Sequence, residues 1–104
     1  MKQNARKAYN ALKRIGAPVL DPDKGWGGHF AISAELYGRD NGYYDGHIDQ
    51  APDGMPWADY YEIVNYDNNF GYTFGVHPAI IKILEDNGLY CEWYNAAVMS
   101  VYDK

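Results

Sequence analysis

The stretch LYCEWYNAAVMSVYDK, residues 89–104, decides the fold class. It holds two short runs of strand-forming residues on either side of Asn95-Ala96, and this pattern predicts a turn between antiparallel strands. Because Asn-Ala is a weaker hairpin signal than Asn-Gly, a four-residue loop is the alternative. The stretch therefore predicts two neighbouring strands of an antiparallel sheet.

The preceding stretch HPAIIKILEDNG, residues 77–88, predicts a helix. Pro78 suits the first helical position, and Gly88 suits the residue that closes a helix. The inner apolar stripe consists of Ile80, Ile83 and Leu84. His77, directly before Pro78, is interpreted as a structural residue at the start of this helix.

Residues 2–15 predict an amphipathic helix, because their apolar members recur at helical spacing and the opposite face is polar or basic. The apolar members are Ala5, Ala8, Tyr9, Leu12 and Ile15. Gly16 and Pro18 end the pattern. The segment DPDKGWGG, residues 21–28, is predicted to be a loop from its turn residues alone.

Two further strands are predicted between the helices. In HFAISAELY, residues 29–37, side chains alternate, which indicates a half-buried strand. The inward set is Phe30, Ile32, Ala34 and Leu36, and the outward set is His29, Ala31, Ser33, Glu35 and Tyr37. The stretch WADYYEIVNY, residues 57–66, is rich in strand formers and is interpreted as a strand, with a short helix starting at Pro56 as the alternative. A polar loop follows at residues 67–75.

The order of helix, strand, long loop, strand, helix, strand and strand predicts an α+β fold. We expect a small, mainly antiparallel sheet of three or four strands with two helices packed on one face. At 104 residues the chain fits one domain, residues 1–104.

Charge is distributed unevenly along the chain, whose net charge is −5. Residues 1–14 contain five Lys or Arg and no acid, whereas residues 35–67 contain eight acids against Arg39 alone. An anionic body is a poor phosphate binder, so direct nucleic-acid binding is not expected. No apolar run is long enough to span a bilayer and no signal peptide is recognised, so we expect a soluble, cytoplasmic protein without membrane contact.

The acidic, glycine-rich middle of the chain does not match an EF-hand, which needs glycine at position 6 and an acidic ligand at position 12 of its loop. With Gly46 at position 6, Pro52 falls at position 12; with Gly54 there, Tyr60 does. An irregular calcium site built from Asp40, Asp45 and Asp49 is left open. No cofactor is predicted.

No catalytic constellation is recognised, so the chain is predicted not to be an enzyme. Cys91 is the single cysteine, which excludes an internal disulfide and the common zinc sites. Nothing near Cys91 in sequence would activate its thiol, and Glu92 beside it would raise the thiol pKa, so we interpret it as buried and inert. The alternative is a small metal-dependent hydrolase that uses His29, His47 and Asp49.

The stretch GRDNGYYDGHIDQAPDG, residues 38–54, and the residues after it carry spaced carboxylates with tyrosine and tryptophan among them. Aromatic residues are favoured at protein interfaces, and spaced carboxylates complement a basic groove. We therefore predict a partner-binding surface here. Its candidate residues are Asp40, Tyr43, Tyr44, Asp45, Asp49, Asp53, Trp57, Asp59, Tyr60 and Glu62.

In size, in acidity and in the acid-aromatic segment 40–62, the chain resembles the small tyrosine-rich anti-defence proteins of phages, of the anti-CRISPR or DNA-mimic type. The resemblance covers composition, and the basic residues 2–14 depart from a pure DNA mimic. It implies a viral, non-enzymatic inhibitor in the host cytoplasm whose acidic surface occupies a basic nucleic-acid-binding site of a partner protein. A homo-oligomeric structural subunit is a further alternative, in which the aromatic residues contact a copy of the same chain.

Overall fold

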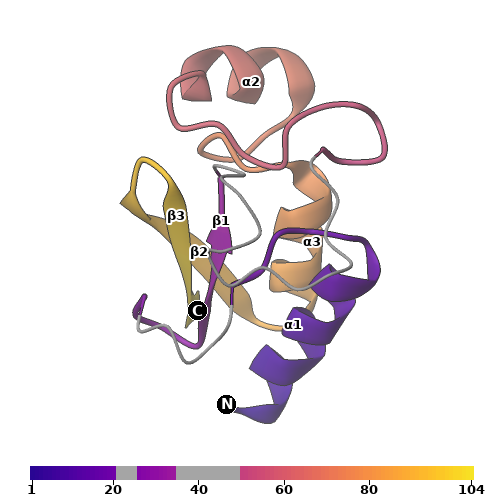
Figure 1. Ribbon diagram of the computed structural model, residues 1–104, viewed down its shortest axis with the longest axis vertical. Coiled ribbons are helices and arrows are strands. Elements are labelled where there is room, and N and C mark those ends of the chain that lie inside the picture. The colour runs from indigo at the N-terminus through magenta and orange to yellow at the C-terminus, as the bar shows by residue number, and fades with distance from the viewer. Residues whose placement is uncertain (21–25, 35–49) are drawn as a thin grey trace.

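The computed structural model describes residues 1–20, 26–34 and 50–104 (Figure 1). Within these residues the chain forms three helices and a three-stranded antiparallel sheet, which confirms the predicted α+β class. In chain order the elements are α1 (Gln3–Arg14), β1 (Phe30–Ser33), α2 (Ile63–Phe70), α3 (Pro78–Asp86), β2 (Leu89–Asn95) and β3 (Val98–Asp103).

The sheet has the strand order β1-β3-β2, with both pairings antiparallel. The predicted hairpin is β2 and β3, and its two-residue turn is Ala96-Ala97, one position later than expected. The Asn95 carboxamide oxygen accepts a hydrogen bond from the Ala97 N–H at 2.8 Å, which explains how the weaker Asn-Ala signal still closes the turn.

The hydrophobic core lies between the sheet and the helices α1 and α3, which Figure 1 shows on one side of the strands. Buried residues of α1 and α3 pack with Leu89 of β2 and with Met99 and Val101 of β3. The helix predicted at 77–88 is confirmed: Pro78 begins it, Ile80 and Leu84 are buried, and Gly88 follows at a left-handed φ of 71°.

The strand predicted at residues 57–66 is wrong. Ala58 makes only an isolated bridge with Val76, after which the chain turns and enters α2. One carboxylate oxygen of Asp59 accepts hydrogen bonds from the N–H groups of Tyr61 and Glu62, at 3.0 and 3.2 Å, and this turn breaks the extended path. The helix then runs through Phe70, four residues into the predicted loop 67–75.

The alternation predicted for residues 29–37 holds for only one face of the strand. Phe30 and Ile32 join the main core as expected, but Ala31 and Ser33 are buried as well. A second cluster, in which Leu20, Ala31 and Val98 pack with Trp26, covers the other face of the sheet at this point. Residues 35–37 lie outside the described residues.

Candidate protein-binding surface

The α2 helix stands at one end of the molecule, away from the sheet (Figure 1), and none of its residues is buried. Most helices in a globular domain bury an apolar stripe against the core. The segment is held instead by its ends: the Asp59 N–H donates to the Gly75 carbonyl at 2.8 Å, and Gly71 ends α2 at a left-handed φ of 72°.

Large apolar and aromatic side chains are exposed around this helix. Five of the large hydrophobic residues that are exposed in the described part of the chain lie between positions 60 and 74: Tyr60, Tyr61, Val64, Phe70 and Phe74. Tyr61 is 75% exposed, Val64 74% and Phe74 69%. We call these five residues, together with the exposed Glu62, the α2 surface.

Phe74 has the only positive φ of a non-glycine residue in the described part of the chain, at 50°. Its N–H and that of Gly75 donate to the two carboxylate oxygens of Asp67, at 2.9 and 2.8 Å. These bonds hold the Phe74 backbone in a left-handed conformation that is costly for a residue with a Cβ. The fold therefore fixes Phe74 in place while leaving its ring in solvent.

Asp53, one of the predicted site residues, anchors the segment that leads to α2. One of its carboxylate oxygens accepts from the Met55 N–H at 3.0 Å, and the other lies 2.8 Å from Nε2 of His77. Because Nδ1 of His77 accepts from the Ala79 N–H at 3.0 Å, Nε2 carries the proton and donates to Asp53. The bond from Met55 first, and then that from His77, lowers the pKa of Asp53.

His77 thus caps α3 through its side chain, which agrees with its interpretation as a structural residue at the start of this helix. Trp57 is placed differently from the prediction. Its side chain lies in the core with only 2% of the residue exposed, so it is unavailable to a partner and is left out of the α2 surface. Its size and burial make it a packing residue, with its ring centroid 5.9 Å from that of His77.

The other described site residues lie at or next to the α2 surface. The carboxylate of Asp59 is engaged by the amides of the turn, and Glu62 is exposed as the residue before α2. The ring of Tyr60 packs edge-on against Tyr61 and Trp93, with centroids 5.6 and 5.3 Å apart. The remaining predicted site residues lie outside the described residues: Asp40, Tyr43, Tyr44, Asp45 and Asp49.

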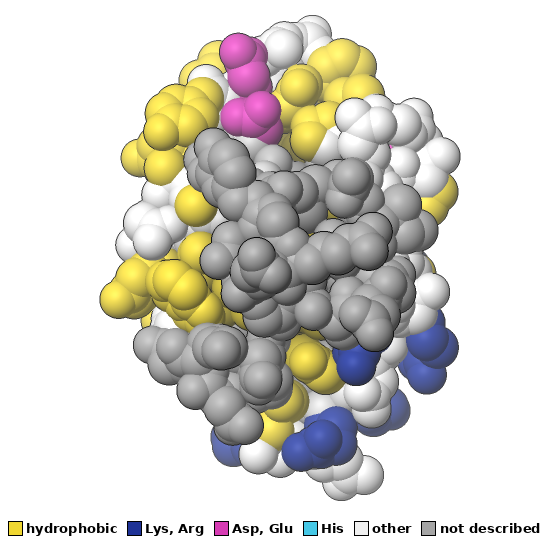
Figure 2. Space-filling view, viewed as in Figure 1, with side chains coloured by type: hydrophobic (Ala, Val, Ile, Leu, Met, Phe, Trp, Pro, Cys, Tyr) yellow, Lys and Arg dark blue, Asp and Glu magenta, His cyan; other side chains and the backbone are white. Residues whose placement is uncertain are grey.

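Figure 2 shows the two signs of charge at opposite ends of the visible face. Lys and Arg side chains gather at the end where α1 lies, and acidic side chains stand among apolar ones at the end of α2. The carboxylates of Asp59 and Asp67 are fixed by main-chain amides in the turns before and after α2. A cationic partner would therefore meet negative charge that is already positioned.

The described residues that were considered for enzyme chemistry are Cys91 and His29. Burial, first of all, raises the pKa of the Cys91 thiol to about 11, which supports the interpretation of an unreactive side chain. Nε2 of His29 lies 3.1 Å from a carboxylate oxygen of Asp103. The described residues contain no group of three or more potential metal ligands; His47 and Asp49 are not among them.

No helix in the described ranges combines the length and the apolar character that crossing a membrane requires.

Of the six residues of the α2 surface, the sequence-based candidate list contains Tyr60 and Glu62 but not Tyr61, Val64, Phe70 and Phe74. The interpretation of 57–66 as a strand accounts for Tyr61 and Val64, because strand alternation gives no reason to expose Val64. Phe70 and Phe74 fell in the predicted loop 67–75, which was not considered as part of the surface. Two local signals could have predicted the exposed α2 helix: Asp59 as a turn-forming residue before it, and Gly71 as the residue that ends a short polar helix.

Comparisons with protein-family models, with curated proteins and with solved structures gave no match.

Proposed function

We propose that this chain is a non-enzymatic binding protein whose α2 surface occupies a basic, nucleic-acid-binding site on a partner protein. The observation that carries the proposal is a helix with no buried residue, surrounded by exposed aromatic side chains and fixed carboxylates. Contiguous exposed apolar groups on a protein commonly mark an interaction site.

The geometry favours binding because the surface is already organised. Asp59 and Asp67 hold the backbone on either side of α2, so little ordering is required when a partner docks. Tyrosine and phenylalanine rings supply contact area with few rotatable bonds, and a well-packed aromatic anchor contributes about 2 kcal/mol or more to binding. The negative charge of the carboxylates then accelerates association with a basic surface and favours basic partners over acidic ones.

We further propose, from the composition shared with phage anti-defence proteins, that the partner is a nucleic-acid-binding defence complex in a host cytoplasm. On the face that Figure 2 shows, acidic side chains lie at the α2 end and Lys and Arg side chains at the α1 end, which supports an acidic contact surface at α2. An acidic end that blocks a basic site would act as an inhibitor by excluding the nucleic acid.

Affinity purification from the native host tests the proposal. The informative variant combines Tyr61→Ser with Glu62→Gln, because both side chains are exposed and Asp53, Asp59 and Asp67 are left to hold the backbone. The matched control is Glu85→Gln, which removes an exposed acid from α3. We expect the double variant to lose at least tenfold in partner recovery and the control to retain it.

Capture by the wild type should also weaken as salt is raised, because screening reduces attraction between exposed charges. Salt-insensitive capture, or equal recovery by the double variant and the control, would contradict the proposal. So would a stable homo-oligomer by light scattering whose interface covers the α2 surface, because that surface would then be unavailable.

A further inference from the structure

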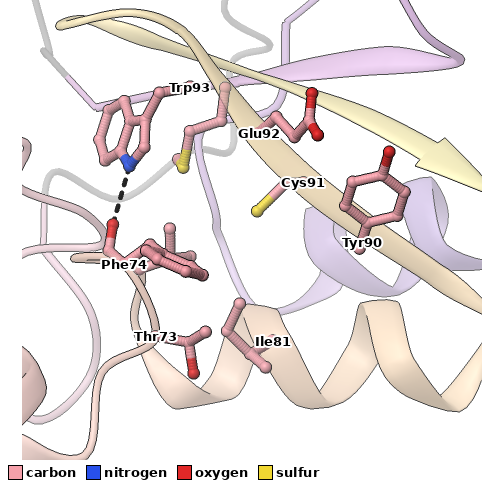
Figure 3. A pocket seen from close by; sticks show the side chains of 9 residues that line it. Thr73, Phe74, Ile81, Tyr90, Cys91, Glu92 and Trp93 are labelled. Carbon is pink, nitrogen blue, oxygen red and sulfur yellow. Dashed lines mark hydrogen bonds between the residues drawn. The ribbon is translucent and has the colours of Figure 1, made fainter. Parts of the chain in front are cut away.

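A groove of about 420 Å³ lies between β2, α3 and the turn at residues 73–76. Figure 3 shows Cys91 and Trp93 of β2 on one side of it, with Phe74 and Ile81 facing them. The indole N–H of Trp93 donates to the Phe74 carbonyl oxygen at 2.8 Å and closes one end. Apart from Glu92 of β2, no Asp, Glu, Lys or Arg of the described residues lines the groove.

The strand beside this groove is at the edge of the sheet. The order β1-β3-β2 leaves one side of β2 without a paired strand among the described residues. An edge strand presents N–H and C=O groups that can pair with an extended segment of another chain. The described structure therefore places an open backbone edge next to an apolar groove.

The hydrogen-bond pattern identifies which backbone groups point outward. The Lys104 N–H donates to the Gly88 carbonyl oxygen at 3.0 Å, which makes these residues a hydrogen-bonded pair in the β2–β3 register. Because such pairs alternate in an antiparallel ladder, Tyr90 and Glu92 point their main-chain groups toward β3, and Cys91 and Trp93 point theirs outward.

The pairing of β3 with β1 agrees with this assignment. The carbonyl oxygen of Val101, the residue opposite Cys91, accepts from the His29 N–H at 2.8 Å and so faces away from β2. Leu89 also points its main-chain groups outward by the same alternation, but it is fully buried. The accessible part of the edge therefore runs from Cys91 to Trp93, both of which are only partly buried.

Side chains along a strand alternate between the two faces of the sheet with the same two-residue period. The residues of β2 therefore indicate which side chains a paired ligand strand should carry. Cys91 and Trp93 turn their side chains into the groove, whereas Glu92, which borders the groove, is exposed and points its carboxylate away from them (Figure 3). A segment that pairs with this edge would place apolar side chains opposite Cys91 and Trp93 and a residue between them opposite Glu92. Opposite charges across a strand pair are favourable, so that residue should be Lys or Arg.

We propose that β2 binds an extended segment of a partner protein with the pattern apolar, basic, apolar, which adds as a fourth strand beside the groove. The inference rests on the proposed function for the charge of the partner, and it adds the mode of contact. A second copy of the chain is a poorer occupant. Glu92 is the midpoint of Leu89–Asn95, so two copies paired antiparallel about this midpoint would oppose two carboxylates.

Phe74 connects the groove with the α2 surface, since it lines the one and belongs to the other. The ring of Tyr60 also contacts Trp93 at the end of the groove. A partner that docks on the α2 surface would therefore bring a neighbouring segment to β2 without crossing another part of the described structure.

The probe is a labelled peptide, TVKVKVT, and its matched control is TVEVEVT. We expect the lysine peptide to bind at least tenfold more tightly by fluorescence anisotropy, and Glu92→Gln to reduce that preference at least threefold. Phe74→Gly should weaken binding of the lysine peptide at least threefold. It removes the ring from the groove wall while placing glycine at a φ that suits it, so the fold should persist.

Amide hydrogen exchange by NMR gives the decisive readout. In the free protein, the Cys91 and Trp93 amides should exchange faster than those of Tyr90 and Glu92, and the lysine peptide should slow both at least tenfold. The proposal is overturned by equally slow exchange of all four amides in the free protein, by binding without protection, by no binding at 1 mM peptide, or by dimerisation through β2.

The two proposals fail separately. If TVKVKVT protects the edge but the Tyr61→Ser, Glu62→Gln variant still captures the partner, the proposed role of the α2 surface is wrong and strand addition stands. If TVKVKVT does not bind while that variant loses its partner, strand addition is wrong and the proposed role of the α2 surface stands.

Discussion

Gly75 is the position where a single added methyl group should do most damage to the α2 segment. Its φ is 78°, and a Cβ there would lie 2.5 Å from the Asp59 carbonyl oxygen and 2.8 Å from Cγ1 of Ile63. Both distances are shorter than real Cβ contacts allow, and the nearer atom belongs to the backbone. Gly75→Ala must therefore shift the crossing between the residues before α2 and the turn after it.

Gly71 is a matched control because it has a similar φ of 72° but no atom within 4 Å of the added Cβ. Left-handed backbone costs an alanine about 1 kcal/mol at either position. Overpacking adds about 2 kcal/mol at Gly75 alone. We therefore expect losses of about 1 kcal/mol for Gly71→Ala and about 3 kcal/mol for Gly75→Ala.

Urea unfolding followed by tryptophan fluorescence measures both losses, and thermal unfolding supplies a second reading. For a chain of this size the midpoint temperature should fall by about 5 °C for Gly71→Ala and by about 15 °C for Gly75→Ala. Equal losses within about 0.5 kcal/mol would show that Gly75 is not in close contact with Asp59 and would refute the described position of α2.

Three further predictions concern titratable side chains. Hydrogen bonds lower the pKa of Asp53 below the ordinary 3.8, so the stability that Asp53 contributes is present above pH 3.8 and is lost as the pH falls through the lowered pKa. Asp53→Asn should therefore reduce the acid-side fall of the urea unfolding midpoint in a plot against pH. An unchanged fall would argue against the Asp53–His77 pair. Iodoacetamide at pH 8 should leave Cys91 unmodified in the folded protein and alkylate it in urea, whereas alkylation at the rate of a free thiol would contradict a pKa of about 11. Tyr72→Phe removes the 2.6 Å hydrogen bond to the Pro56 carbonyl oxygen and should lower the free energy of unfolding by about 1 kcal/mol. Burial raises the pKa of Tyr72 to about 12, so ultraviolet absorbance of the wild type should show a tyrosine that ionises near pH 12 and that Tyr72→Phe removes.

Elements whose signals are local could be predicted from the sequence. Residues 2–15 and 77–88 carry helical periodicity with glycine or proline at their boundaries, and both helices form. The hairpin at residues 89–104 was predicted for the same reason, since its strand formers flank a turn residue that bonds its own backbone. In each case the local preference and the burial pattern agree.

The α2 segment could not be predicted because its composition and its environment disagree. Tyrosine, isoleucine and valine at residues 60–64 favour a strand where they pack on a pleated surface. No strand lies beside them among the described residues, and the carboxylate of Asp59 turns the chain at once. The alternation in β1 failed for a related reason, because Trp26 and Leu20 cover a face that was expected to be exposed.

The candidate site shows the same division between charge and burial. Acidic residues at 53–67 could be assigned to a surface from sequence, since carboxylates are rarely buried. Which aromatic residues join them depends on tertiary packing: Trp57 enters the core and Tyr61 does not. No periodicity in the sequence distinguishes these two rings.

The central claim is that the end of the molecule around α2, and not the basic end at α1, contacts the partner. Hydroxyl-radical footprinting of the complex captured from the host tests it most directly, because exposed reactive side chains mark both ends: Tyr61 and Phe74 near α2, and Met1 before α1. We predict that complex formation protects Tyr61 and Phe74 and leaves Met1 as reactive as in the free protein. Protection of Met1 with unchanged reactivity at Tyr61 and Phe74 would contradict the claim.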